Sequence, residues 1–259
     1  LGVKWFAWLF AIVTIFACGL FLPGVQSNAI AVSMENAFGI TPAISAAVVA
    51  ALLSFIIFGG VKRIAAFTAL VVPFMAQAYV IVALVIVFMH VDMLADILKL
   101  IVSSAFGMDA GFGAILGMAV SWGVKRGIYS NEAGQGTGPH ASSAASVSHP
   151  VKQGLVQAFS VYVDTLLVCS ATAFMILITG SYNVVGPDNN HIFEGLKNVA
   201  TGPAYTQAAV ESLMPGFGQA FVAVALFFFA FTTILAYFYI AETNVAYLNR
   251  KLKMPTLYF

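Results

Sequence analysis

Ser130 to Pro139 read SNEAGQGTGP, a polar and glycine-rich stretch with one carboxylate inside a sequence that is otherwise almost wholly apolar. Lipid offers no hydrogen-bond partners to the backbone. Non-helical segments therefore survive at membrane depth only where protein buries them or where they line a water-filled cavity. The stretch predicts a break in a transmembrane helix and a candidate binding site.

The composition around this stretch is that of a membrane protein. Of the 259 residues, 61% are hydrophobic and only 8% are charged, against about 25% charged in soluble domains. The sequence predicts an all-α polytopic membrane protein. The net charge of +1 gives no reason to expect a nucleic-acid partner. No nucleophile, base or metal-ligand pattern suggests an enzyme.

Runs without charge predict the membrane spans, because a transmembrane helix needs about 20 mostly apolar residues. We expect one transmembrane domain over residues 1–259. The chain begins at Leu1 without an initiator Met or a signal-peptide pattern, so we expect an internal fragment. The long spans are predicted at residues 5–25, 40–60, 65–89, 155–180 and 217–246.

Most Lys and Arg residues fall on one side if these spans alternate, and the positive-inside rule makes that side cytoplasmic. They are Lys4, Lys62, Arg63, Lys152, Arg250, Lys251 and Lys253. On the other side, Asp92–Ala105 and Ile192–Val199 are predicted to form short amphipathic helices.

The chain must still cross once between Asp109 and Lys152. The uncharged run after Asp109 is too short to do so, because as a helix it would rise about 22 Å against a hydrocarbon core of about 30 Å. We therefore predict a discontinuous helix over residues 113–147, with an unwound centre at 130–136 and a second half from Ala141 to Val147. In the alternative, residues 130–149 form a cytoplasmic loop, which leaves one crossing missing.

Broken helices suit ligand binding, because their free N–H groups face anions and their unwound carbonyls coordinate cations. Gly134 and Gly136 permit close approach of the backbone. Glu132 costs about 2.5 to 3.5 kcal/mol at membrane depth unless it is hydrated or paired. Two hypotheses stay open: Glu132 pairs with Lys125 or Arg126 and braces the break, or it binds a ligand.

Asp164 is a second carboxylate, predicted deep in the span at 155–180. Its position favours cation coordination or proton carriage, with a neutral packing role as the alternative.

Thr232 and Thr233 interrupt an apolar run. In one interpretation their hydroxyls hydrogen-bond to carbonyls of the preceding turn. In the other they coordinate a monovalent cation, and Tyr237 forms part of the wall of a substrate pocket. Gln26 follows Pro23-Gly24 and is either a solvated helix end or turned to a cavity by a kink.

Long segments around these residues resemble the alanine or glycine:cation symporter family, also called sodium:alanine symporters. The resemblance covers essentially the entire chain. It rests on RGIYSNEAGQGTGPHASSAASVSHPVKQG, VYVDTLLVCSATAFMILITG, GGVKRIA, VVPFMAQAYV and FAFTTILAYFY.

The resemblance implies part of a leucine-transporter-type fold with two inverted five-helix repeats. The broken helix would be the sixth core helix, Asp164 would lie on the seventh, and Thr232 and Thr233 on the eighth. It also implies substrate contacts along the break. The full expected set of substrate residues is Asn131, Glu132, Gly134, Gln135, Gly136, Gln26, Thr233 and Tyr237, and the expected sodium ligands are Thr232, Thr233 and Asp164.

The expected function is sodium-coupled symport of a small neutral amino acid by alternating access across a bacterial or archaeal plasma membrane. No cofactor and no metal other than sodium is expected; the partners are the amino acid, sodium and the bilayer. Gln135 and Tyr237 stand where many relatives are more apolar or carry Trp, so glutamine or serine joins alanine and glycine as a candidate. The alternatives are a proton-coupled carrier, with Asp164 or Glu132 titrating, and an ion channel. The family's Gly-Thr-Gly-Asn run is absent, so the fragment is not expected to transport by itself.

Overall fold

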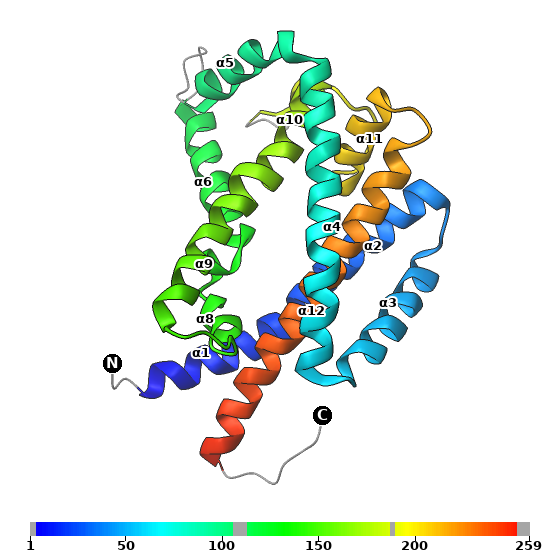
Figure 1. Ribbon diagram of the computed structural model, residues 1–259. Helices are drawn as coiled ribbons and strands as arrows, with labels where there is room; N and C mark the ends of the chain where they lie inside the picture. Colours follow the sequence, from blue (N-terminus) through cyan, green and yellow to red (C-terminus); the bar gives the residue numbers. More distant parts are fainter. Residues whose placement is uncertain (1–3, 106–112, 187–189, 253–259) are drawn as a thin grey trace. The chain divides into compact units, whose positions relative to one another are not determined.

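The computed structural model describes residues 4–105, 113–186 and 190–252, and these are mostly helical (Figure 1). Within those ranges, four continuous helices are long and apolar enough to cross a membrane. They are Lys4–Phe38, Gly60–Met89, Pro150–Ile178 and Gly218–Arg250. A further apolar helix, α3 (Pro42–Ile57), has 16 residues. The mostly helical, polytopic architecture expected from the sequence is confirmed.

The first long helix does not end near Val25. It consists of α1 (Lys4–Phe16), a π-helical turn η1 (Ala17–Phe21) and α2 (Leu22–Phe38). The π turn ends two residues before Pro23, whose ring and missing N–H disfavour regular α-helix through the preceding turn. Because α2 continues for twelve residues beyond Gln26, the interpretation of Gln26 as a helix end is wrong.

The described helices form two compact units. The first takes in Leu1–Pro73, Pro139–Ser146 and Leu226–Phe259; the second takes in Phe74–Gly138 and Val147–Ala225. Two long helices, α4 (Gly60–Met89) and α12 (Gly218–Leu252), contribute to both units. The expectation of a single transmembrane domain stays a prediction.

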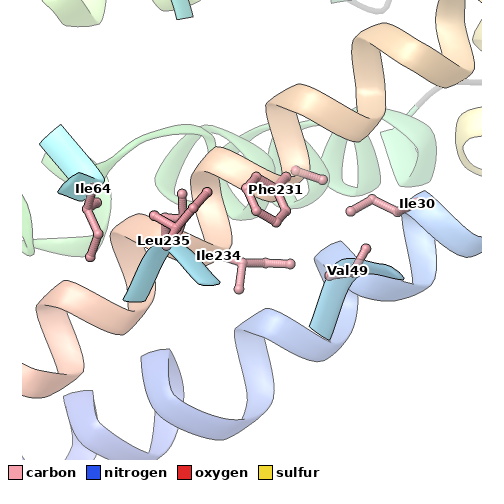
Figure 2. Packing of buried hydrophobic residues seen from close by; sticks show 8 residues of the cluster. Ile30, Val49, Ile64, Phe231, Ile234 and Leu235 are labelled. Atoms are coloured by element: carbon pink, nitrogen blue, oxygen red, sulfur yellow. The ribbon is translucent and has the colours of Figure 1, made fainter. Parts of the chain in front are cut away.

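The core of the first unit is a cluster of aliphatic and aromatic side chains from four helices (Figure 2). Ile30 of α2 and Val49 of α3 meet Phe231 and Leu235 of α12, and Ile64 of α4 completes the contact. Further along α12, Tyr237 and Ala241 pack against Cys18 in the π turn. Close packing of these side chains holds α2 and α3 against α12, because van der Waals contacts drive the association of helices in a membrane.

The second unit contains the segments that follow α4. They are η2 (Val91–Met93), α5 (Leu94–Ala105), α6 (Gly113–Ser130), α7 (Glu132–Gln135), α9 (Pro150–Tyr162), the π-helical η3 (Val163–Cys169), α10 (Ser170–Ile178) and α11 (Pro203–Leu213). The Tyr79 hydroxyl of α4 lies 2.7 Å from Thr172 Oγ1 of α10, so these two helices share a hydrogen bond between a buried and a half-buried side chain.

One expected helix is a strand. β1 (Asn183–Val185) pairs antiparallel with β2 (His191–Glu194), so the prediction of a helix at Ile192–Val199 is wrong and the fold is not purely α. Val184 and Phe193 face each other in this pair, and β-branched and aromatic residues favour such a pleated surface. The Asn183 amide closes the hairpin through two hydrogen bonds with the Leu196 backbone, at 2.7 and 2.8 Å.

A carboxylate holds the tight turn between α11 and α12. Glu211 accepts hydrogen bonds from the backbone N–H of Gly216, at 2.5 Å, and of Gln219, at 2.9 Å. Gly218 lies so close to Val210 and Glu211 that a Cβ would overlap their backbone. The bond from Gly216, and then the bond from Gln219, lower the pKa of the Glu211 carboxyl. The first N–H groups of α12, which have no partner within the helix, are thereby partly satisfied.

Glu211→Gln should lower the thermal stability of the full-length protein at neutral pH. The folded-state pKa lies below the unfolded value, so the stabilisation is present above the unfolded pKa and is lost as the pH falls through the folded pKa. The difference in melting temperature between wild type and variant should therefore disappear in acid. Glu194→Gln, in the exposed strand β2, is the control and should show no such difference. A gap that persisted unchanged in acid would contradict this role for the carboxylate.

Candidate functional site

The helix break lies where the glycine-rich stretch predicts it. α6 ends at Ser130, and Asn131 adopts an extended conformation, with φ −149° and ψ 174°. Its side-chain Oδ1 accepts a hydrogen bond from the Ala133 N–H at 3.0 Å and so caps the single helical turn α7. Asn131 therefore both interrupts the backbone and satisfies an N–H group that the interruption exposes.

Two glycines let the chain fold over the end of α6. A Cβ at Gly134 would overlap the backbone of Ile128, so only glycine permits this approach. Gly136 has φ 75°, the left-handed conformation that glycine adopts at no steric cost, and it ends α7. The Thr137 N–H then donates to the Glu132 carbonyl at 3.1 Å. The two glycines are therefore needed for the conformation of the break itself. This need is separate from the predicted close approach of the backbone to a ligand.

The second half of the broken helix is shorter than predicted. α8 covers only Gly138–Ser142, and the helix expected from Ala141 to Val147 is not formed. The sequence after it is SAASVSH, and serine hydroxyls compete for backbone carbonyls and favour turns over helix interiors. Ser143 Oγ does so here, donating to the His140 carbonyl at 2.8 Å.

Gln135 folds back onto the end of α6. Its Nε2 donates to the Tyr129 carbonyl at 3.1 Å, which identifies the other amide atom, Oε1, as the acceptor. Gln135 Oε1 and the Tyr129 hydroxyl are both buried, and neither has a hydrogen-bond partner among the described residues. A buried polar group left unpaired costs about 1 to 3 kcal/mol, so each of these atoms gains from any partner that reaches it.

The break contacts the second intramembrane carboxylate. Ser130 Oγ, the last hydroxyl of α6, donates to Asp164 Oδ2 at 3.3 Å and lies 3.7 Å from Cys169 Sγ. Both Asp164 and Cys169 belong to η3, the π-helical segment within the continuous helix Pro150–Ile178. π-Helical segments are rare and occur often at functional sites. Two irregular backbone segments thus meet through one serine.

Glu132 is exposed, and its two expected partners are occupied elsewhere. The Lys125 ammonium lies 5.2 Å and the Arg126 guanidinium 5.6 Å from the centre of the Trp122 ring. The predicted ion pair between Glu132 and either cation is not formed. Both cations instead stack on an aromatic face of their own helix.

The other candidates lie in the first unit. Thr232 Oγ1 donates to the Phe228 and Phe229 carbonyls, at 2.9 and 3.0 Å, and Thr233 Oγ1 donates to the Phe229 carbonyl at 2.8 Å. Both hydroxyls therefore bond back to the preceding turn. Tyr237 is 3% exposed and packs against Cys18 and Ile240, whereas Gln26 is half-buried on α2.

Two residues of the break had not been singled out from the sequence. Ser130 was the first letter of the polar stretch, but nothing in its surroundings indicated that it would reach Asp164, 34 residues further along the chain. Tyr129 stands three residues after Arg126, and nothing in its sequence surroundings marked it as a site residue. Both were identifiable only as the last turn before a predicted break, where side chains and carbonyls lose their helical neighbours.

The model of the sodium:alanine symporter family matches residues 1–259. The chain belongs to that family. The resemblance seen in the sequence is thereby confirmed, and the family indicates a membrane transporter rather than an enzyme.

Three relatives give the degree of similarity. A Bacillus subtilis protein is 62% identical over 250 residues, covering 96% of this chain and 52% of the relative. The sodium/proton-dependent alanine carrier protein of Bacillus sp. is 57% identical over 246 residues, covering 95% of this chain and 55% of its own. The probable sodium/glutamine symporter GlnT of Bacillus subtilis is 39% identical over 258 residues, covering 100% of this chain and 51% of the relative. The chain spans about half the length of these curated relatives.

Gly134→Ala should abolish the native break, because the added methyl group overlaps the Ile128 backbone, which cannot rotate away. The matched control is Gly154→Ala on α9, where a Cβ meets nothing within 4 Å. In full-length protein, the first variant should lose most folded yield in size-exclusion chromatography and should melt at a lower temperature. The second should be neutral or stabilised by about 0.5 to 1 kcal/mol. Equal behaviour of the two variants would show that close approach at Gly134 is not required.

Proposed function

We propose that the chain is the part of a sodium-coupled symporter that binds a small neutral amino acid at the break between α6 and α8. The observation that carries the proposal is the hydrogen bond from Ser130, at the break, to Asp164 in the π-helical η3. It joins a segment with exposed backbone groups to a carboxylate in an apolar helix. This pairing suits a zwitterionic substrate accompanied by a cation.

The substrate residues we propose at the break are Asn131, Glu132, Gly134, Gln135 and Gly136. Interrupted backbone presents N–H groups to a carboxylate and carbonyls to an ammonium group or cation. The buried and unpartnered Gln135 Oε1 supports a further hydrogen bond to the substrate. Gln26, Thr233 and Tyr237 stay predicted substrate contacts in the first unit.

We also propose that sodium has Thr232 and Thr233 among its ligands, and that Asp164 is a cation ligand as well. A threonine hydroxyl that donates its hydrogen to a carbonyl keeps its oxygen lone pairs. The back-bonds from Thr232 and Thr233 to Phe228 and Phe229 orient these lone pairs and are therefore compatible with a sodium ligand. Hydroxyl and carboxylate oxygens suit a hard cation.

Two observations support a leucine-transporter-type arrangement of inverted repeats, which we also propose. They are the family membership of the chain and the break between α6 and α8. A discontinuous helix with a single helical turn at its centre is the device by which such transporters build a site at membrane depth. In this proposal, α6 to α8 complete the crossing that the distribution of Lys and Arg requires.

Proton coupling is the second candidate. The Bacillus sp. relative, which is named a sodium/proton-dependent alanine carrier protein, favours it. Asp164 is the residue we assign to it, because this carboxylate lies in an apolar helix and bonds to a hydroxyl that can rearrange when the carboxylate is protonated.

Uptake by the full-length protein in proteoliposomes tests the proposed function. With an inward sodium gradient, labelled alanine or glutamine should accumulate above the external concentration, and accumulation should saturate with substrate. A proton gradient imposed without sodium tests the second candidate. Uptake that neither saturates nor exceeds equilibrium would contradict symport and favour a channel.

Thr233→Ala should raise the sodium concentration for half-maximal uptake by about 5- to 30-fold, since losing one oxygen ligand costs about 1 to 2 kcal/mol. The matched control is Thr243→Ala, which removes a hydroxyl that back-bonds to Tyr239 on the same helix in the same way, at 2.8 Å. The control should leave the sodium dependence unchanged. Equal shifts in both variants would indicate a helix effect and argue against a ligand role for Thr233.

A further inference from the structure

A second polar cluster lies in the first unit, where α1, α8 and α12 contribute one side chain each. His140 of α8 stacks on the ring of Phe10 of α1, with ring centres 6.0 Å apart and planes inclined by 11°. Its Nε2 lies 2.9 Å from Asn244 Nδ2 of α12. His140 belongs to neither the proposed substrate set nor the proposed cation set.

The hydrogen bonds of Asn244 fix the protonation state of the imidazole. Asn244 is 5% exposed, and its Nδ2 donates to the Ile240 carbonyl at 2.8 Å. That bond identifies Nδ2 as the amide nitrogen, which has only hydrogens to offer. His140 Nε2 must therefore be the acceptor, so the ring is neutral and its proton sits on Nδ1.

A proton on His140 Nε2 would destroy this contact, because two donors would then face each other. Turning the Asn244 amide over would not repair it. The amide oxygen would then face the Ile240 carbonyl oxygen as well as the ring, and two buried acceptors would oppose each other. The contact with Asn244 therefore holds only while the imidazole is neutral.

The charged groups on the elements around His140 are few. α1 carries Lys4, six residues before Phe10, and α12 carries Glu242, Arg250 and Lys251. Glu242 lies two residues before Asn244, about 200° around the helix from it, and is exposed. The segment Pro139–Ser146 itself carries no Lys, Arg, Asp or Glu.

We infer that His140 is a proton-binding site that acts as a latch. The neutral ring holds Pro139–Ser146, the segment directly after the helix break, on α12 and α1; protonation releases it. The test compares one pH above and one pH within the range in which histidine side chains ordinarily change charge. The inference goes beyond symport and is independent of which cation drives transport.

The test measures the position of this segment directly. Nitroxide labels are attached to Ser146→Cys and Ala246→Cys, both exposed positions, in full-length protein freed of other reactive cysteines and reconstituted in nanodiscs. Electron paramagnetic resonance then gives the label-to-label distance distribution at pH 8 and pH 5.5. The wild-type background should shift to longer and broader distances in acid, and the shift should reverse on return to pH 8.

Three variants isolate His140. His140→Gln keeps an acceptor for Asn244 but cannot be protonated, so its distances should be independent of pH. His149→Gln is the matched control, because His149 caps α9 through Val151 and should leave the wild-type response intact. Asn244→Leu removes the donor to His140 and should give the longer, broader distances already at pH 8.

A wild-type distribution that is the same at both pH values, or a pH response that survives in His140→Gln, overturns the inference. Because the distances are read without transport, this failure is distinguishable from a failure of sodium-coupled uptake.

Discussion

An irregular segment at membrane depth must satisfy its own backbone, because hydrocarbon offers neither donors nor acceptors. At the break, Asn131 receives the Ala133 N–H, and Gln135 donates to the carbonyl of Tyr129. Within η3, Ser170 Oγ donates to the Thr165 carbonyl at 3.1 Å. Polar residues in this otherwise apolar sequence thus lie where the regular helix is interrupted. Their first role is to replace the backbone hydrogen bonds that the interruption removes.

We propose that the same residues supply the chemistry of transport. Where side chains provide the hydrogen bonds of a backbone segment, the side chains can exchange partners and the segment can change conformation. A regular helix in lipid cannot do so, because its backbone groups have no other partners there. Ser130 links such a segment to Asp164, so neutralising that carboxylate with a cation or proton alters the bond that reaches the break. On this account, the free energy of cation binding is transmitted to the substrate through one hydroxyl.

The sequence predicted the features that depend on composition and spacing. Charge-free runs identified the long helices, and SNEAGQGTGP located the break within one residue of where α6 ends. It did not predict the π-helical segments, because the insertion of one residue into a helical turn leaves little trace in an apolar run. The second half-helix was overestimated because small residues suit helix packing in membranes, whereas at this site the serines bond to the backbone.

The candidate residues were predicted less completely for a physical reason. Residue types marked Asp164, Glu132, Thr232 and Thr233 as unusual at their depth, but hydrogen-bond partners depend on contacts between distant segments. The pairing of Ser130 with Asp164 was therefore not readable from the chain. The stacking of Lys125 and Arg126 on Trp122 is local, at spacings of three and four residues on one helix, and the sequence did contain that spacing.

The most direct test of the account is the linkage between sodium and substrate in the purified full-length protein. Equilibrium binding of labelled alanine, measured over a range of sodium concentrations, should show affinity rising with sodium by about 5- to 150-fold, the usual range for coupled sites. In Ser130→Ala the rise should shrink, whereas in Ser160→Ala, whose hydroxyl bonds only to Gln157 of its own helix, it should be unchanged. A sodium dependence that is identical in wild type and Ser130→Ala would contradict the proposed link.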